Sequence, residues 1–143
     1  DVYLNIGFGT GVYNGVKVFD GDLKEFELAD IKIFTEKITL VKGSSDNGSS
    51  VIYAVASNAG AKTTIVAENP TSGDKEFIEF GVLDDGTDVF HTEYGNIRTG
   101  AQLIVPTFEV TGAGDVRINI TLGSEVNPTE AVNITVVSNV TKK

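Results

Sequence analysis

The chain has 143 residues, 20 acidic against 11 basic side chains, and no cysteine. A net charge of −9 leaves no basic stripe to neutralise phosphates, so neither nucleic acid nor an anionic membrane is expected as a partner. The lack of cysteine excludes a disulfide framework and a cysteine nucleophile, and no apolar run approaches the ~18 residues of a membrane span. The length suits one domain with an ordinary hydrophobic core.

The chain begins at Asp1 without a methionine, so it is predicted to be a processed or truncated product. A lost signal peptide, a maturation cleavage or a further upstream segment would each explain this start. Residues 1–15 have apolar side chains at every second position from Val2 to Phe8, interrupted by glycines at 7, 9, 11 and 15. Because glycine weakens a strand, this stretch is either the first core strand or an arm that completes the sheet of a neighbouring subunit. As an arm it would contact the neighbour through Tyr3, Leu4, Phe8 and Tyr13.

Short strands separated by turn residues are predicted along the next part of the chain. The first of them are residues 16–19, 24–28, 31–34 and 37–41. A polar loop at 43–50 then divides an N-terminal arm and β-strand region (1–43) from a β-sandwich module (44–143), unless both form one continuous domain. Residues 51–57 are apolar on both faces, which is typical of a central strand.

A hairpin at the centre of the fold is predicted from residues 76–83 and 88–94. The Asp-Gly step between them supplies the positive φ that a tight turn requires. Both strands alternate apolar and polar side chains, as in a sheet covered on one side. The positions expected to be buried are Ile78, Phe80, Val82, Phe90 and Tyr94.

The C-terminal part continues the same pattern, with strands predicted at 102–105, 107–110, 116–122 and 131–140. Pro106 divides the first two and suits a strand edge or a bend, because proline cannot donate a ladder hydrogen bond. No window shows a sustained helical period. The chain is therefore predicted to be all-β, an antiparallel β-sandwich or jelly-roll-like domain with an N-terminal extended arm.

No catalytic residue, metal site or cofactor is predicted, and the chain is not expected to be an enzyme. His91 is the single histidine and is interpreted as a sheet-surface residue, since a catalytic base needs a nucleophile and an acid that converge on it. One histidine without cysteine excludes a zinc site of the usual type. The aspartates at 84–88 and 20–22 match no calcium-loop spacing and are interpreted as turn formers.

Four asparagines fit the N-glycosylation pattern: Asn47, Asn119, Asn133 and Asn139. Strand faces rich in Asn and Thr also produce such matches without any glycan. Both interpretations stay open.

Residues 85–95 (DGTDVFHTEYG), the following RTG at 98–100 and the later GDVRINIT at 114–121 carry a resemblance. Over about residues 51–140 the chain resembles a β-sandwich domain of virion structural proteins from marine tailed bacteriophages, cyanophages among them. The proline that usually follows the last motif is replaced here by Leu122-Gly123. The resemblance implies a non-enzymatic virion protein, most simply a capsid decoration or cement protein or a head-fibre component. Its partners would be other virion proteins and copies of itself.

Two other interpretations remain. One is a secreted cellular filament or surface-layer subunit, extracellular or at the cell surface, joined by donor-strand exchange; the arm and the glycosylation patterns suit it. The other is a carbohydrate-binding module at a host surface, which the absence of tryptophan weakens. The virion and filament interpretations both predict a homo-oligomer that assembles through apolar arm and β-edge contacts.

Overall fold

The computed structural model describes residues 2–4, 16–19 and 25–143, and the structural statements below concern these residues. They contain eleven strands and no helix, hence none that could cross a membrane. The strands are β1 (Val2–Leu4), β2 (Val16–Phe19), β3 (Glu25–Leu28), β4 (Ile31–Val41), β5 (Asn47–Ala54), β6 (Asn58–Glu68), β7 (Lys75–Asp84), β8 (Val89–Arg98), β9 (Ile104–Val110), β10 (Asp115–Leu122) and β11 (Ala131–Lys142).

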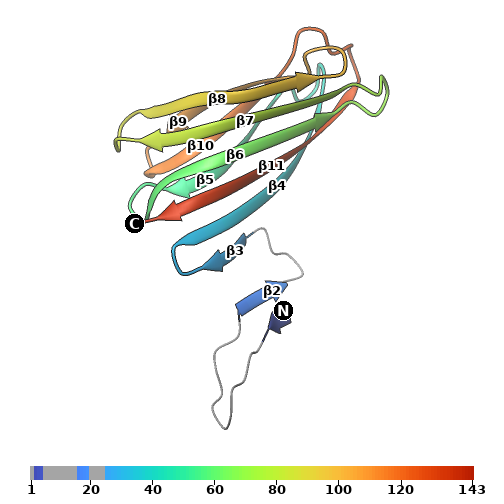
Figure 1. Ribbon diagram of the computed structural model, residues 1–143. Coiled ribbons are helices and arrows are strands. Elements are labelled where there is room, and N and C mark those ends of the chain that lie inside the picture. Colours follow the sequence, from blue (N-terminus) through green and yellow to red (C-terminus); the bar gives the residue numbers. More distant parts are fainter. Residues whose placement is uncertain (1, 5–15, 20–24) are drawn as a thin grey trace.

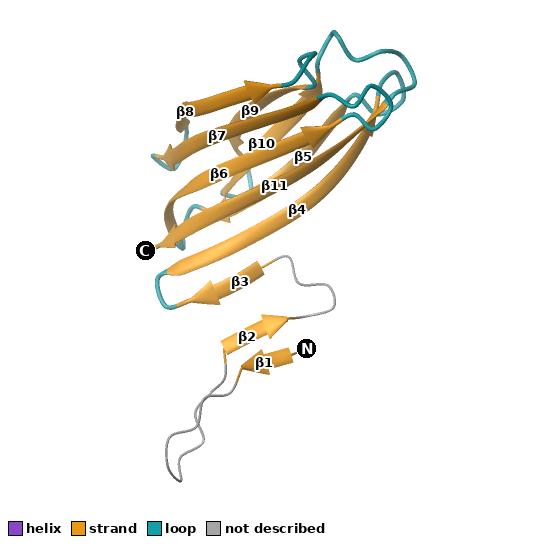
Figure 2. Ribbon diagram, turned by 45° about the vertical axis from the view of Figure 1, so that its right-hand side comes forward, coloured by secondary structure: helices purple, strands orange, loops and turns teal. Residues whose placement is uncertain are grey.

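Two antiparallel sheets pack face to face, as Figure 1 shows. The larger sheet has the strand order β3-β4-β11-β6-β7-β8, and the smaller has the order β5-β10-β9. β1 and β2 form a separate pair that lies beyond β3 (Figure 2). The predicted all-β, antiparallel β-sandwich is confirmed.

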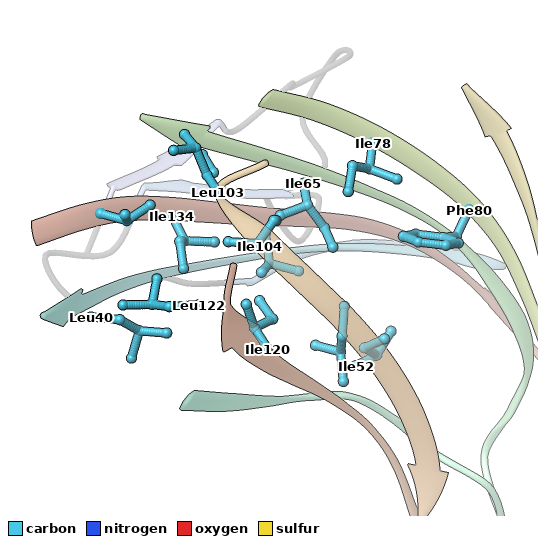
Figure 3. Close-up of a cluster of buried hydrophobic side chains, with 14 of the residues drawn as sticks. Leu40, Ile52, Ile65, Ile78, Phe80, Leu103, Ile104, Ile120, Leu122 and Ile134 are labelled. Carbon is cyan, nitrogen blue, oxygen red and sulfur yellow. The ribbon is translucent and has the colours of Figure 1, made fainter. Parts of the chain in front are cut away.

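The core lies between the two sheets, where Figure 3 shows side chains of both layers meeting. Ile65, Ile78 and Ile134 extend from the larger sheet, and Ile118 and Ile120 from the smaller, all at most 2% exposed. Each such side chain contributes roughly 1.5–3 kcal/mol through its burial. We call the core-facing side of the larger sheet its inner face and the opposite side its outer face.

β4 is one continuous strand, so the predicted break at residues 35–36 is wrong. It pairs with β11 from Val41↔Ala131 to Ile31↔Thr141 without interruption. The strand continues through the polar residues 35–36 because β11 pairs with them as well. The local sequence does not reveal this pairing. β4 precedes the predicted boundary after residue 43, yet it shares one sheet with the C-terminal strand.

β5 is an edge strand of the smaller sheet, not the central strand predicted from its two apolar faces. A register shift opposite Val116 and Arg117 places Ile52 and Tyr53 both in the core, at 2% and 1% exposure. A β-bulge therefore produced the apolar run that resembled a central strand. Pro106 does lie in an edge strand, β9, as predicted, but the strand runs unbroken from Ile104 to Val110, so the predicted division at Pro106 is wrong.

β7 and β8 form the predicted hairpin, and Gly86 adopts a φ of +93° in its turn. β8, however, lies at the edge of the larger sheet rather than at its centre. The predicted burial of Phe90 and Tyr94 is wrong, since they are 57% and 68% exposed. Phe90 pairs with Leu83 and so lies on the outer face, opposite to buried Phe80.

Candidate functional site

The most distinctive surface is the outer face of β7 and β8. Four large apolar side chains there are more than half exposed, and we call them the apolar strip: Leu83, Phe90, Tyr94 and Ile97. Leu83 lies opposite Phe90 in the β7–β8 ladder, and Ile97 lies opposite the half-buried Phe77. The strip therefore follows the length of the hairpin and does not arise from scattered single residues.

Two glycines shape the strip. A Cβ on Gly81 would lie 2.9 Å from Cε2 and Oη of Tyr94, and a Cβ on Gly60 would lie 2.6 Å from Cδ2 of Leu83. Both large side chains thus rest on bare backbone. Tyr94 itself is an extra residue between Glu93 and Gly95, which pair with Phe80 and Glu79.

An open groove of about 970 Å³ runs beside the strip across β6, β7 and β8. Its polar lining includes Lys62 and Glu79, whose Nζ and Oε1 atoms are 3.1 Å apart. This ion pair leaves the groove close to neutral. The groove can accommodate an extended, mostly apolar partner.

β8 is exposed on both faces, and in the described part of the chain it pairs with β7 alone. On the inner face of β8 the smaller sheet contacts His91, whose ring lies 4.8 Å from that of Phe108 on β9, while Glu93 and Asn96 stay exposed. A long edge strand with an unoccupied backbone side readily pairs with another chain. β8 is therefore a candidate edge for pairing with another chain.

His91 lies on the inner face of β8, opposite Val82, and is exposed as predicted. Its ring centroid is 5.8 Å from that of Phe80 and 4.8 Å from that of Phe108. The imidazole thus packs on aromatic rings. Within the described residues no group of three or more His, Asp or Glu side chains could hold a metal ion.

The aspartates of the β7–β8 turn act on the fold. The Tyr53 hydroxyl donates to Oδ2 of Asp84 at 2.8 Å, while Oδ1 of Asp84 accepts the Gly86 N–H. Burial of the Tyr53 side chain, and then the Asp84 carboxylate, raise the pKa of Tyr53 well above its ordinary value. Backbone N–H groups of Asp88 and Thr87 lower the pKa of Asp85. These contacts agree with the prediction that the cluster forms a turn.

Tyr53→Phe is expected to flatten the loss of stability at high pH. Unfolded tyrosine ionises near pH ~10, whereas folded Tyr53 stays protonated above that pH. Its contribution to stability is therefore full below pH ~10 and is lost as the pH rises toward the folded pKa. Urea unfolding of wild type and Tyr53→Phe between pH ~8 and ~11 measures the difference. If the free energy of unfolding fell equally steeply with pH in both proteins, the prediction would be wrong.

A smaller groove of about 460 Å³ lies where the inner face of β4 meets the edge of β5. The hydroxyl of Ser50 lines it, and this residue is 6% exposed. Among the residues described, the Ser50 Oγ atom has no hydrogen-bond partner. Sequence reasoning placed Ser50 in a flexible loop and missed this position.

The four glycosylation candidates lie apart from the apolar strip. Asn133 and Asn139 are exposed on β11, and Asn47 is exposed at the start of β5. Asn119 is half-buried, and its Nδ2, the atom that would carry a glycan, donates to Oε1 of Glu109 at 2.7 Å. This bond and those from Arg117 lower the pKa of Glu109. Glycosylation of these sites stays a prediction.

The predicted arm contacts are only partly within the described structure. Tyr3 and Leu4 lie in β1, where they pair with Lys17 and Val16 of β2. Phe8 and Tyr13 lie outside the described residues. Contact of these four side chains with a neighbouring subunit stays a prediction. The sequence does not reveal the apolar strip as a surface, because the alternation of Phe90 and Tyr94 on β8 is equally typical of side chains that face a core.

No protein-family model matches the chain, and no curated protein matches it. Among solved structures, the chain is similar to the tailspike protein of Acinetobacter phage vB_ApiP_P1, with a TM-score of 0.49 and 14% identity. The similarity covers 92% of this chain and 26% of the tailspike, so the chain spans about a quarter of that protein's length. A likeness this weak implies nothing about function. The resemblance to marine-phage domains gains no support from the family models and stays a prediction.

Proposed function

We propose that this chain is a non-enzymatic structural protein of a phage virion, a capsid decoration or cement protein or a head-fibre component. It assembles through β-edge contacts and its N-terminal arm. The observation that carries the proposal is the exposed edge strand β8 with the apolar strip beside it. Soluble monomers rarely leave a long apolar edge uncovered, because such an edge pairs with other chains. A repetitive particle covers it.

The chemistry of the groove supports a structural role over a catalytic one. Lys62 is paired with Glu79, and the imidazole of His91 packs on Phe80 and Phe108. These titratable side chains therefore contact each other or aromatic rings instead of converging on one reacting atom. The virion, as opposed to a cellular filament, is favoured by the DGT…TEYG and VRINIT segments of the sequence.

Quantitative mass spectrometry of particles purified from the source tests this function. The copy number of the chain is compared with that of the most abundant shell protein. A ratio near one, or a simple fraction of one, is expected for capsid decoration, and a few dozen copies or fewer for a fibre. Finding the chain as the dominant protein of a filament without shell protein would overturn the virion assignment in favour of a cellular filament.

A further inference from the structure

The β7–β8 ladder defines which β8 side chains share a face. Inner-face residues of β7 pair with Val89, His91, Glu93, Asn96 and Arg98. Outer-face residues pair with Phe90, Thr92, Gly95 and Ile97. Tyr94 is the extra residue of the bulge, so the alternation changes phase after Glu93. Any strand added to the free edge of β8 must match these faces.

We propose that β8 pairs antiparallel with β8 of a second copy, about a two-fold axis that passes beside Thr92. The two larger sheets become one continuous sheet, and both smaller sheets lie on the same side of it. This inference rests on the proposed structural function and specifies its contact. A two-fold contact of this kind uses the same surface on both copies.

Face matching and charge select the register. With the axis at Thr92, His91 lies opposite Glu93 of the second copy, and each such pair occurs twice. The imidazole can donate to the carboxylate and forms an ion pair with it when protonated. Tyr94, as the extra residue of the bulge, takes no position in the pairing. On the outer face, Phe90 therefore lies opposite Gly95 of the second copy, where an aromatic ring covers bare backbone.

Two alternative registers toward the C-terminal end of β8 are less favourable. An axis at Glu93 would place the two Glu93 carboxylates directly opposite each other, and like charges in that position are destabilising. An axis at Gly95 would place His91 opposite Arg98 of the second copy and Phe90 beyond the end of the strand. The register at Thr92 avoids both arrangements.

Charge and area also suit a second copy as the occupant. β8 carries one Glu and one Arg, so the net charge of −9 of the chain is not concentrated at this edge. Aromatic side chains bury ~150–250 Å² each, so Phe90 and Tyr94 at 57% and 68% exposure each offer on the order of 100 Å². In the continuous sheet the outer face stays open, so only the sides of Phe90, Tyr94 and Ile97 that face the second copy are buried, and they supply part of the roughly 1,200 Å² of a small specific interface beside the β8–β8 backbone ladder.

Cross-linking tests the register, because a chain without cysteine acquires a single thiol from one substitution. Thr92→Cys places that thiol on the axis, where paired Cα atoms lie about 4.5–5.5 Å apart, within disulfide range. The control is Thr107→Cys on β9, an exposed threonine on another edge strand. Mild oxidation should yield a covalent dimer of Thr92→Cys at least about tenfold faster than of Thr107→Cys. Equal rates would overturn the proposal.

A charge exchange tests the pairing by itself. His91→Glu opposes two carboxylates, and Glu93→Lys removes the acceptor of His91, so each should weaken dimerisation about tenfold in analytical ultracentrifugation. The double variant His91→Glu/Glu93→Lys restores opposite charges and should regain the wild-type dimer. It retains the His91 change next to Phe80 and Phe108, so a mere folding defect would persist in it.

The failure of this inference is distinct from failure of the proposed function. A monomeric wild-type chain, or a double variant as weak as the single ones, overturns β8 pairing while the copy number in particles still decides the virion role. Recovery of a dimer whose Thr92→Cys does not cross-link assigns the contact to another surface, such as the arm, and overturns the proposal as well.

Discussion

Replacing Glu76 with alanine is expected to lower the free energy of unfolding by about 3–5 kcal/mol. Glu76 is 1% exposed at the start of β7. Its Oε1 accepts from Nε of Arg98 at 2.7 Å, and its Oε2 accepts from the N–H groups of Leu103 and Ile104 at 2.8 and 3.1 Å. Alanine would leave two buried backbone donors without a partner and Arg98 without its carboxylate.

The matched control is Glu79→Ala on the same strand. Glu79 lies on the outer face and pairs with the exposed amine of Lys62, so its removal should cost less than about 1 kcal/mol. Urea unfolding of both variants compares the two costs. Domains of this size are stable by only about 5–15 kcal/mol, so Glu76→Ala should show a greatly reduced midpoint. Similar midpoints for the two variants would mean that Glu76 has no special structural role.

The second large effect is expected at Gly123, just after β10. A Cβ at this position would lie 2.1 Å from the carbonyl oxygen of Gln102 and 2.9 Å from its carbonyl carbon. The Gly123 N–H also donates to the Leu103 carbonyl at 2.8 Å. Because the opposing atoms are backbone, they cannot move as a flexible side chain would. Gly123→Ala should therefore cost about 2–3 kcal/mol.

Gly112→Ala is the control for that substitution, since a Cβ on Gly112 meets nothing within 4 Å. It should change the unfolding midpoint by little. Equal, small effects of both substitutions would contradict the close approach at Gly123. Glu76 and Gly123 contact the same segment, residues 102–104, from two sides. The double variant Glu76→Ala/Gly123→Ala should therefore lose less stability than the sum of the two single losses.

This segment connects the stability of the core to the candidate surface. It leads into β9, whose Phe108 lies 5.1 Å from Phe80 and 4.8 Å from His91, centroid to centroid. The inner face of β8 therefore packs against β9 at His91. The start of β9 depends in turn on the buried carboxylate of Glu76 and on the close approach of Gly123. Displacement of β9 would remove the aromatic support of His91.

The sequence by itself determined the features that depend on near neighbours. Strict alternation identified the core positions of β10 and β11, and those of β7 at Ile78, Phe80 and Val82, all of which are buried. The Asp-Gly step identified the turn that Gly86 makes. Pro106 indicated an edge strand, since proline lacks the N–H that an interior ladder needs. Each of these is a local property of backbone or side chain.

The tertiary structure alone decided which face of each strand is covered and which strands lie at an edge. Alternation on β8 separates Phe90 from His91, but it does not say which of them faces the second sheet. In the sequence Glu76 is no different from any other charged strand residue. Only the fold brings the backbone N–H groups of residues 103 and 104 to its carboxylate. β4 became one strand because β11, about a hundred residues later, supplies its ladder. Pairing between distant segments has no counterpart in local sequence, and the apolar strip on β8 exists because of that pairing.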